Sequence, residues 1–301
     1  MIARVDEIAG EERKSAATCA IRHHYDVGDD FYGLWLDPSL SYSCAMPTDA
    51  ADTLDVAQQR KLRFHLEAVR ADTARSILDV GCGWGAILEQ ASVKYDVTRA
   101  VGLTLSATQT RHIRELALRG VEVRTENWMD FAPDDRFGGI ISIGAFEHFA
   151  RPDDTPAEKI GIYREFFSRC RTWLNSDGTL SLQTIAYANM SRSDANSFMQ
   201  QEIFPDADLP TLTEIVSAAD GLFEVQSVAN GRLDYAWTCE QWAQRLRARR
   251  EEANALVGED VVARYERYLK MSAIGFRMNK ICLLRLVLRP YAGGHFGGLP
   301  R

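Results

Sequence analysis

A short apolar strand that runs into a glycine-rich turn and then into a helix constrains this chain more than any other feature. Residues 75–80 read RSILDV, residues 81–85 read GCGWG, and AILEQASVKY at 86–95 has the apolar spacing of a helix. Three glycines at a strand–helix junction carry a conformational cost, which a close approach of a ligand to the backbone would explain. The segment therefore predicts a ligand-binding turn at the end of a buried strand.

Strands and helices alternate through much of the remaining chain. Further segments with strand composition lie at 99–106, 121–128, 138–146, 178–187 and 222–229, and helical stretches at 107–120 and 157–174 lie between some of them. This alternation predicts an α/β fold with a doubly wound, mostly parallel sheet that is covered by helices on both faces. In such a sheet, ligands bind beyond the carboxyl ends of the strands.

We expect three parts along the chain. Residues 1–70 precede the first core strand and are expected to form an N-terminal helical cap, and residues 71–290 form the main domain. Within that domain, 186–210 and 239–280 stand outside the alternation and are expected to be helical lid insertions. Residues 291–301 are expected to be a flexible tail.

Charge and cysteine usage exclude several classes of protein. The formal charge of -7 at pH 7 argues against a broad nucleic-acid interface, which needs a basic face. The six cysteines are scattered, with no CxxC pair and no histidine at zinc spacing, so we expect reduced thiols, no metal site and a cytoplasmic location. The N-terminus lacks the apolar core of a signal peptide, and the apolar segment at 281–290 is short and interrupted by Arg285.

The glycine turn fits two classes of cofactor site. Gly81, Gly83 and Ala86 satisfy the dinucleotide pattern GxGxx(G/A), whereas Asp79 ahead of the same glycines also fits the nucleotide-binding turn of a methyltransferase. Asp79 would suit the cationic amino-acid group of S-adenosylmethionine (SAM) and would repel a pyrophosphate. The glycines alone leave both classes open.

The next predicted strand separates the two classes. A dinucleotide site needs an acidic residue about twenty positions further on to bind the ribose. At that distance the chain reads VGLTLSATQ, where Thr104 and Gln109 are the hydrogen-bonding groups. We therefore favour SAM, and an NAD-linked oxidoreductase remains the weaker alternative.

Six stretches of the chain resemble the cyclopropane fatty acid synthase family, especially its mycolic acid branch of SAM-dependent methyltransferases. They are HYDVGDDFYGLWLDPSLSYSCAMP (24–47), ILDVGCGWGAIL (77–88), YDVTRAVGLTLSATQ (95–109), SIGAFEHF (142–149), EIFPDADLP (202–210) and DYAWTCEQW (234–242). They occur in order and span most of the chain. The resemblance implies a Rossmann-like class I methyltransferase fold.

The resemblance also implies which residues bind SAM. Tyr42, Ser43, Gly81 and Trp84 would hold its methionine part, Thr104 and Gln109 the ribose, and Trp128 would flank the adenine. Together with the glycine-turn residues, these give the expected cofactor site: Tyr42, Ser43, Asp79, Gly81, Gly83, Trp84, Thr104, Gln109 and Trp128.

The reaction of this family explains a carboxylate at the end of an apolar strand. Methylation of an alkene creates a carbocation that must lose a proton, and a carboxylate in an apolar pocket stabilises that charge. By the resemblance, Glu147 would help to hold a bicarbonate that serves as base, Tyr235 corresponds to a family tyrosine, and the backbone amides of Cys44 and Ile143 complete the anion site.

One departure from the family pattern concerns the proton transfer. Where family members read His-Thr-Ile, this chain has Gln183 followed by Thr184 and Ile185. Glutamine can donate a hydrogen bond to bicarbonate but cannot relay a proton. The product could therefore be a cyclopropane, or a C-methylated alkene or methylene compound with Glu147 acting directly as base.

A second departure concerns the substrate. The stretch 186–201, which in the mycolic acid branch covers the acyl channel, is short and polar here. We therefore expect a C-methyltransferase that acts on a double bond of a hydrophobic acyl or isoprenoid lipid, or of a specialised metabolite. The basic run RLRARR at 245–250 suits an acyl carrier protein or a substrate phosphate, although such a run is more often a solvated helix face. A peripheral membrane contact is the other expected route of delivery.

Two other functions fit the same sequence. One is N- or O-methylation of a small molecule on the same scaffold, and amine methylation often needs little beyond proximity and desolvation. The other is a protein that binds SAM or a lipid without catalysis, but Asp79, Gly81, Gly83, Glu147 and Tyr235 are all present, which argues against a decayed site.

Overall fold

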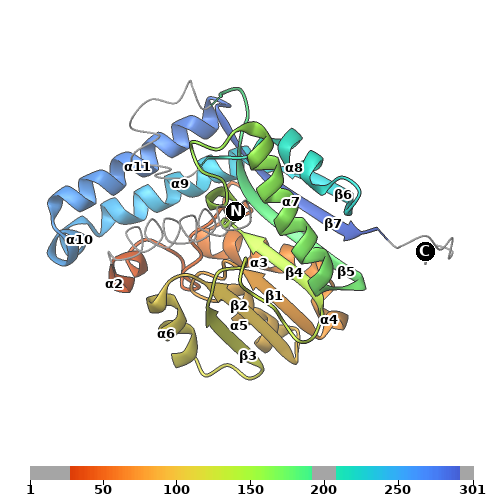
Figure 1. Cartoon of the computed structure of the whole chain (residues 1–301). Helices are drawn as coiled ribbons and strands as arrows, with labels where there is room; N and C mark the ends of the chain where they lie inside the picture. Colours follow the sequence, from red (N-terminus) through yellow and green to blue (C-terminus); the bar gives the residue numbers. More distant parts are fainter. Residues whose placement is uncertain (1–27, 192–207, 292–301) are drawn as a thin grey trace, which may run out of the picture.

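A single mixed sheet organises the computed structural model, which describes residues 28–191 and 208–291 (Figure 1). The strands of this described part are β1 Ser76–Val80, β2 Arg99–Thr104, β3 Val121–Thr125, β4 Phe137–Ile143, β5 Leu174–Tyr187, β6 Phe223–Asn230 and β7 Ile281–Pro290. Their order across the sheet is β3-β2-β1-β4-β5-β7-β6. Strands β1 to β5 pair in parallel, and β7 is antiparallel to both β5 and β6. The predicted doubly wound, mostly parallel sheet is confirmed.

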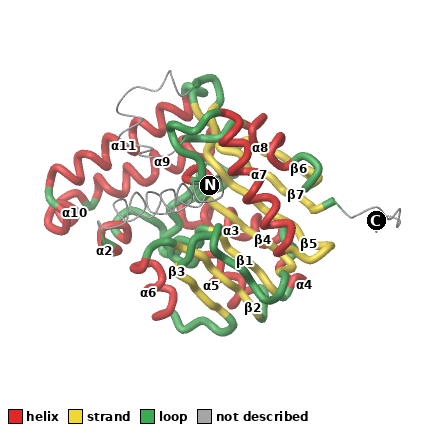
Figure 2. Tube along the Cα trace, viewed as in Figure 1, coloured by secondary structure: helices red, strands yellow, loops and turns green. Residues whose placement is uncertain are grey.

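Helices cover both faces of the sheet (Figure 2). They are α2 Asp29–Gly33, α3 Leu54–Ala68, α4 Ala71–Ala74, α5 Ala86–Lys94, α6 Ala107–Glu115, α7 Pro156–Trp173, α8 Leu212–Ala219, α9 Arg232–Ala248, α10 Arg250–Val257 and α11 Glu259–Arg277, with a 3-10 turn η1 at Phe146–His148. Helix α7 begins where Thr155 and Glu158 form a capping box with Pro156 in the first turn.

Side chains of the central strands point alternately to the two faces of the sheet, so the core of the sheet has two layers. Leu78 and Ile140 pack on the face covered by α7 and α8, whereas Ile77 and Ile141 pack on the face covered by α3, α5 and α6. Neighbouring residues of a strand point to opposite faces, so a strand buried on both sides is apolar throughout. This explains the continuous apolar run in β4.

A third apolar cluster lies beyond one end of the sheet, where α9, α10 and α11 gather beside α2 (Figure 1). It is rich in aromatic side chains, among them Phe31, Trp35, Trp242 and Tyr265, and it includes Trp84 from the turn after β1. These helices therefore cover the end of the sheet where a ligand is expected.

Some expected boundaries fall differently. Strand β5 begins at Leu174, before the expected residue 178, and continues to Tyr187, so the first two residues of the expected 186–210 insertion belong to the sheet. Much of that insertion, residues 1–27 of the N-terminal cap and nearly all of the tail lie outside the described residues. The division into cap, main domain and lid insertions stays a prediction.

Across residues 28–191 and 208–291, no helix has the length and apolarity needed to cross a membrane. The five cysteines in this part of the chain are buried and unpaired.

Candidate active site

The turn after β1 lies in close contact with the turn after β4. Gly81 has φ +82°, and a Cβ added there would lie 2.4 Å from the Cβ of Ala145. The amides of Gly81 and Cys82 donate to the carbonyl of Leu103 at 3.0 and 2.9 Å, which ties the turn to β2. A side chain at Gly81 would force these two turns apart, so glycine is required at this position.

A cavity of about 580 Å³ opens at this end of the sheet, beyond the carboxyl ends of β1, β2 and β4. All nine expected cofactor residues line it: Tyr42, Ser43, Asp79, Gly81, Gly83, Trp84, Thr104, Gln109 and Trp128. Ile143, expected in the anion site, also lines the cavity. Segments from five parts of the sequence are thus brought to one pocket.

The groups expected to bind ribose are held by each other. The Thr104 hydroxyl donates to Oε1 of Gln109 at 2.6 Å, and Ser106 caps α6 by accepting from the Gln109 amide. Because its side-chain oxygen is occupied, Gln109 has its NH₂ group left to donate to a ligand hydroxyl. This geometry suits a ribose.

The expected adenine residue belongs to both the core and the cavity wall. The ring of Trp128 lies 4.9 Å from that of Phe149 and 5.4 Å from that of Phe166, between centroids. Glu126 and Asn127, which the sequence analysis missed, line the same part of the cavity directly after β3. Their position after a strand is the signal that could have found them.

Two buried charges face the opposite part of the cavity. Asp79 lies near the end of β1, and burial raises its pKa to about 7. Lys61 on α3, which the sequence analysis also missed, donates to the Ser43 hydroxyl at 3.0 Å, and burial lowers its pKa to about 8. Both side chains line the cavity.

Glu147 lies in η1, just past the end of β4, and is buried outside the residues that line the cavity. Its Oε1 accepts from the backbone amide of Ile185 at 2.6 Å, whereas Oε2 has no hydrogen-bond partner among the described residues. Burial raises the pKa of Glu147 to about 7, and the hydrogen bond from Ile185 opposes that rise. The carboxyl group can therefore change its protonation state near neutral pH.

Tyr235 lies near enough to Glu147 for the carboxyl group to act on it electrostatically, and Cys44 acts on the same tyrosine. Tyr235, on α9, stacks on Phe276 with ring centroids 4.6 Å apart. Burial raises the pKa of Tyr235 well above its usual value, and the neighbouring Tyr268, Cys239 and Glu147 raise it further. Burial also raises the pKa of the Cys44 thiol to about 12, so Cys44 stays protonated and is not a nucleophile.

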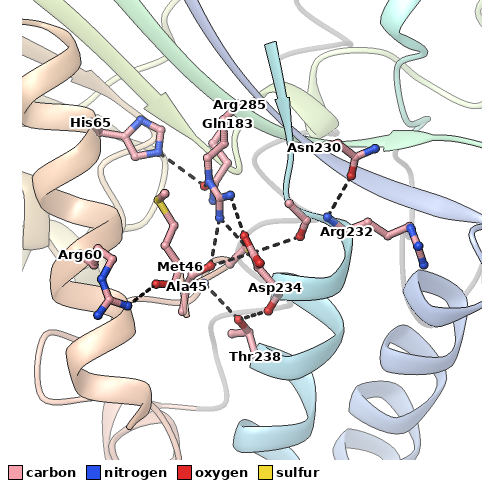
Figure 3. Close-up of polar contacts among 12 residues, drawn as sticks. Ala45, Met46, Arg60, His65, Gln183, Asn230, Arg232, Asp234, Thr238 and Arg285 are labelled. Atoms are coloured by element: carbon pink, nitrogen blue, oxygen red, sulfur yellow. Dashed lines mark hydrogen bonds and ion pairs between the residues drawn. The ribbon is translucent and has the colours of Figure 1, made fainter. Parts of the chain in front are cut away.

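Gln183 belongs to a buried network centred on Arg285 (Figure 3). Arg285 Nε donates to Gln183 Oε1 at 2.8 Å, Nη1 pairs with Asp234 at 3.0 Å, and Nη2 donates to Cys44 Sγ and to the Ala45 carbonyl at 3.3 and 2.9 Å.

His65 completes the network, with Nε2 at 3.5 Å from the same Gln183 oxygen (Figure 3). The oxygen of the Gln183 amide is thus occupied, which leaves its NH₂ group as the donor for a ligand. Burial lowers the pKa of His65 well below its usual value, so this histidine is neutral. Neither Arg285 nor His65 was predicted from the sequence as a member of the site.

The fold, the glycine turn and the hydrogen-bonding groups together define a SAM-dependent methyltransferase. The family model for mycolic acid cyclopropane synthetase matches residues 12–286, and the chain belongs to this family. The predicted family is thereby confirmed, as is SAM as the cofactor, which relatives solved with SAH support.

Relatives and solved structures agree with this assignment. Cyclopropane mycolic acid synthase 1 of Mycobacterium tuberculosis (strain ATCC 25618 / H37Rv) is 36% identical over 280 residues, which cover 87% of this chain and 93% of the relative. Cyclopropane mycolic acid synthase 2 of Mycobacterium bovis (strain ATCC BAA-935 / AF2122/97) is 32% identical over 307 residues, covering 95% and 100%.

A crystal structure of mycolic acid cyclopropane synthase CmaA1 complexed with SAH and CTAB superimposes with a TM-score of 0.81 at 34% identity, covering 91% of this chain and 98% of that one. Coclaurine N-methyltransferase shares the fold, with a TM-score of 0.74 at 21% identity.

Proposed function

We propose that this protein methylates a carbon–carbon double bond of a lipid-like substrate, with proton loss to a base at Glu147. The observation that carries the proposal is a buried carboxylate whose Oε2 has no hydrogen-bond partner among the described residues, close to the cofactor cavity and the aromatic cluster. N-methylation of an amine often needs little beyond proximity and desolvation and would not need such a group.

The aromatic side chains beside the cavity suit a cationic reaction. Tyr42 lines the cavity, and its ring lies 5.2 Å from that of Trp242 and 5.4 Å from those of Tyr32 and Trp35, between centroids. Tyr235 also packs against Trp242, with ring centroids 6.0 Å apart. The faces of such rings attract cations, and bound SAM supplies an electrophilic methyl group on a sulfonium. These residues would therefore stabilise positive charge on the substrate.

The groups around Glu147 also suit a bound bicarbonate. An ionised Glu147 would accept the bicarbonate O–H at Oε2, and the Gln183 NH₂ group and the amides of Cys44 and Ile143 would donate to its oxygens. The Tyr235 hydroxyl, kept protonated by burial, would be a further donor. We assign these residues to the anion site on that basis.

We propose a hydrophobic acyl or isoprenoid substrate that reaches the protein through a peripheral membrane contact. Leu233, Ile274 and Met278 are exposed, and the Arg232 guanidinium donates to the carbonyls of Phe276 and Arg277, which brings the start of α9 to the end of α11. Apolar and basic side chains on one surface suit a peripheral membrane contact.

An acyl carrier protein is the weaker route of delivery. Within the basic run, Arg245 pairs with Asp55, Arg249 with Glu252, and Arg250 lies near Glu259 and Glu266. These arginines are already partly neutralised by the protein's own carboxylates.

Feeding deuteromethyl methionine to cells that express the protein tests this function. We expect a labelled, lipid-like product in the extracts, and its absence in cells that express Glu147→Gln. Loss of one deuterium would show that the transferred carbon was deprotonated, as ring closure requires, and full retention would show a methylated alkene. A labelled polar amine, formed equally by both proteins, would refute alkene methylation.

The pH dependence of catalysis should follow Glu147. Its pKa is raised to about 7, and the reaction needs the ionised form. We therefore expect kcat/KM to fall as the pH is lowered through about 7, close to tenfold for each unit below it. Measurement of initial rates from about pH 5.5 to 8.5 checks this, and a flat profile in that range would contradict the role of Glu147.

A further inference from the structure

The side-chain amide of Gln183 has a fixed direction in the buried network of Figure 3. Gln183 is 1% exposed, and Arg285 Nε donates to its Oε1 at 2.8 Å. An arginine side chain carries N–H donors and no acceptor, so only the oxygen end of the amide can face it. With the amide turned around, two buried donors would face each other without an acceptor, which costs free energy. The contact with Arg285 therefore sets which end of the amide points away from the network.

The other polar neighbours of the Gln183 side chain have no such fixed polarity. His65 Nε2 lies 3.5 Å from Oε1, and His65 Nδ1 lies 2.8 Å from the Ser181 hydroxyl. Burial holds the pKa of His65 well below its usual value, so the ring is neutral and either nitrogen can carry its proton. A hydroxyl also donates or accepts. Among the contacts of the Gln183 side chain within the described residues, Arg285 is thus the one whose polarity cannot reverse.

Arg285 is itself held in place by partners from two other segments. Its Nη1 pairs with Asp234 on α9 at 3.0 Å, and its Nη2 donates to the Ala45 carbonyl at 2.9 Å. Gly231, which precedes α9, leaves space for the guanidinium, since a Cβ added there would lie 2.4 Å from Nη1. The guanidinium therefore has little freedom to follow a rotated Gln183 amide.

The strand that carries Gln183 also contacts the turn that carries Glu147. The Gln183 carbonyl accepts from the Gly144 amide at 3.0 Å, and Glu147 Oε1 accepts from the Ile185 amide, further along β5, at 2.6 Å. Glu147 Oε2 has no hydrogen-bond partner in the described part of the chain. A donor that projects from Gln183 is thus close to the carboxyl group of the proposed anion site.

We infer that Arg285 is a positioning residue, which holds the Gln183 amide with its NH₂ group turned away from the network as a donor for the anion site at Glu147. The use of that donor rests on the proposed function, whereas the direction of the amide follows from the contacts of Arg285 alone. Arg285 does not line the cofactor cavity and acts through Gln183.

The tautomer of His65 reports the direction of the amide without any measurement of activity. With the Gln183 oxygen toward it, His65 must donate from Nε2 and accept at Nδ1 from the Ser181 hydroxyl. Nitrogen NMR of protein labelled in its histidines distinguishes the two tautomers, and the His65 signals are identified by their loss in His65→Gln. We expect the Nε2–H tautomer alone in the wild type and in Arg285→Lys, which keeps a donor without an acceptor. Arg285→Met should show both tautomers.

Turnover tests whether the fixed donor is used. Removal of one preorganised donor from a catalytic anion site lowers kcat by about 100- to 1,000-fold, and we expect a loss of this order for Gln183→Met. For Arg285→Met, we expect a loss of at least about tenfold, because the amide is then reversed for part of the time. The double variant should match Gln183→Met within about twofold, since the amide through which Arg285 acts is absent. Arg285→Lys should retain more turnover than Arg285→Met.

Initial rates at saturating SAM, with vesicles of total lipid from the expressing cells, measure these effects. Affinity for S-adenosylhomocysteine should stay within about twofold of the wild type in all four variants, since neither residue lines the cofactor cavity. Arg119→Met removes an exposed arginine that pairs with Asp96 at 2.8 Å, and this control should keep full turnover. Gly231→Ala crowds the guanidinium without removing it, and it takes the place of Arg285→Met in the cycle where that variant folds poorly.

Three results would overturn the inference. One is a wild-type His65 in the Nδ1–H form, and another is wild-type turnover in both Arg285→Met and Gly231→Ala. The third is an equal loss from Arg285→Met with and without Gln183→Met, which would show a structural role independent of the amide. A wild-type protein with the expected tautomer that methylated no lipid carbon would instead refute the proposed function and the use of the donor, while the direction of the amide would stand.

Discussion

Replacing Glu147 by glutamine is expected to lower kcat by about 100- to 10,000-fold. The amide keeps the shape of the side chain, and its oxygen can still accept the hydrogen bond from Ile185 that Oε1 accepts at 2.6 Å. It carries no negative charge, so it can neither stabilise the carbocation nor support proton removal. Initial rates with saturating SAM measure the effect.

Cofactor affinity separates this effect from general damage to the site. Glu147 is outside the residues that line the cofactor cavity, so the affinity of Glu147→Gln for S-adenosylhomocysteine should stay within about twofold of the wild type. Glu240→Gln, which removes an exposed carboxylate of α9 that pairs with Arg277, is the matched control and should keep full activity. A turnover for Glu147→Gln near that of the control would contradict the proposed chemistry.

Replacing Arg285 by methionine is expected to lower the free energy of unfolding by about 3–5 kcal/mol. The Arg285 side chain is 3% exposed and joins β7 to three other segments through Gln183, Asp234, and the adjacent Cys44 and Ala45. Its removal leaves buried acceptors without a donor, which costs more than the pair itself contributes. Urea denaturation measures the loss.

Two further variants show whether the loss of stability in Arg285→Met comes from the buried network. Arg277→Met breaks a well-formed but exposed ion pair with Glu240 and should cost less than about 1 kcal/mol. Adding Asp234→Asn to Arg285→Met should recover part of the loss, because the unpaired carboxylate is then removed. Equal losses for Arg285→Met and Arg277→Met would contradict the structural role of the buried network.

The fold could be predicted well where its determinants are local. The strand, glycine turn and helix at residues 75–95 appear as β1, its turn and α5 with boundaries shifted by one residue. The cofactor residues could be predicted because motifs that follow successive parallel strands converge at one end of the sheet. The antiparallel insertion of β7 between β5 and β6 depends on long-range pairing and had no local signal.

The residues that the sequence analysis missed are polar side chains with distant partners. Arg285 was interpreted as an interruption of an apolar segment, because its partners Gln183 and Asp234 lie 102 and 51 residues away in the chain. Lys61 and His65 did leave a signal, since they lie on the buried stripe of α3 with Leu54. Charged or polar residues at the apolar positions of an amphipathic helix indicate a site, and this pattern could have been found.

The proposed function requires that the methyl group of SAM is transferred to a carbon atom of the substrate. We would grow cells that express the protein on methionine labelled with carbon-13 in the methyl group, isolate the labelled product and record its carbon NMR spectrum. We expect a signal from a carbon bound only to carbon and hydrogen, and none from cells that express Glu147→Gln. A labelled carbon bonded to nitrogen or oxygen, formed in both cultures, would contradict it.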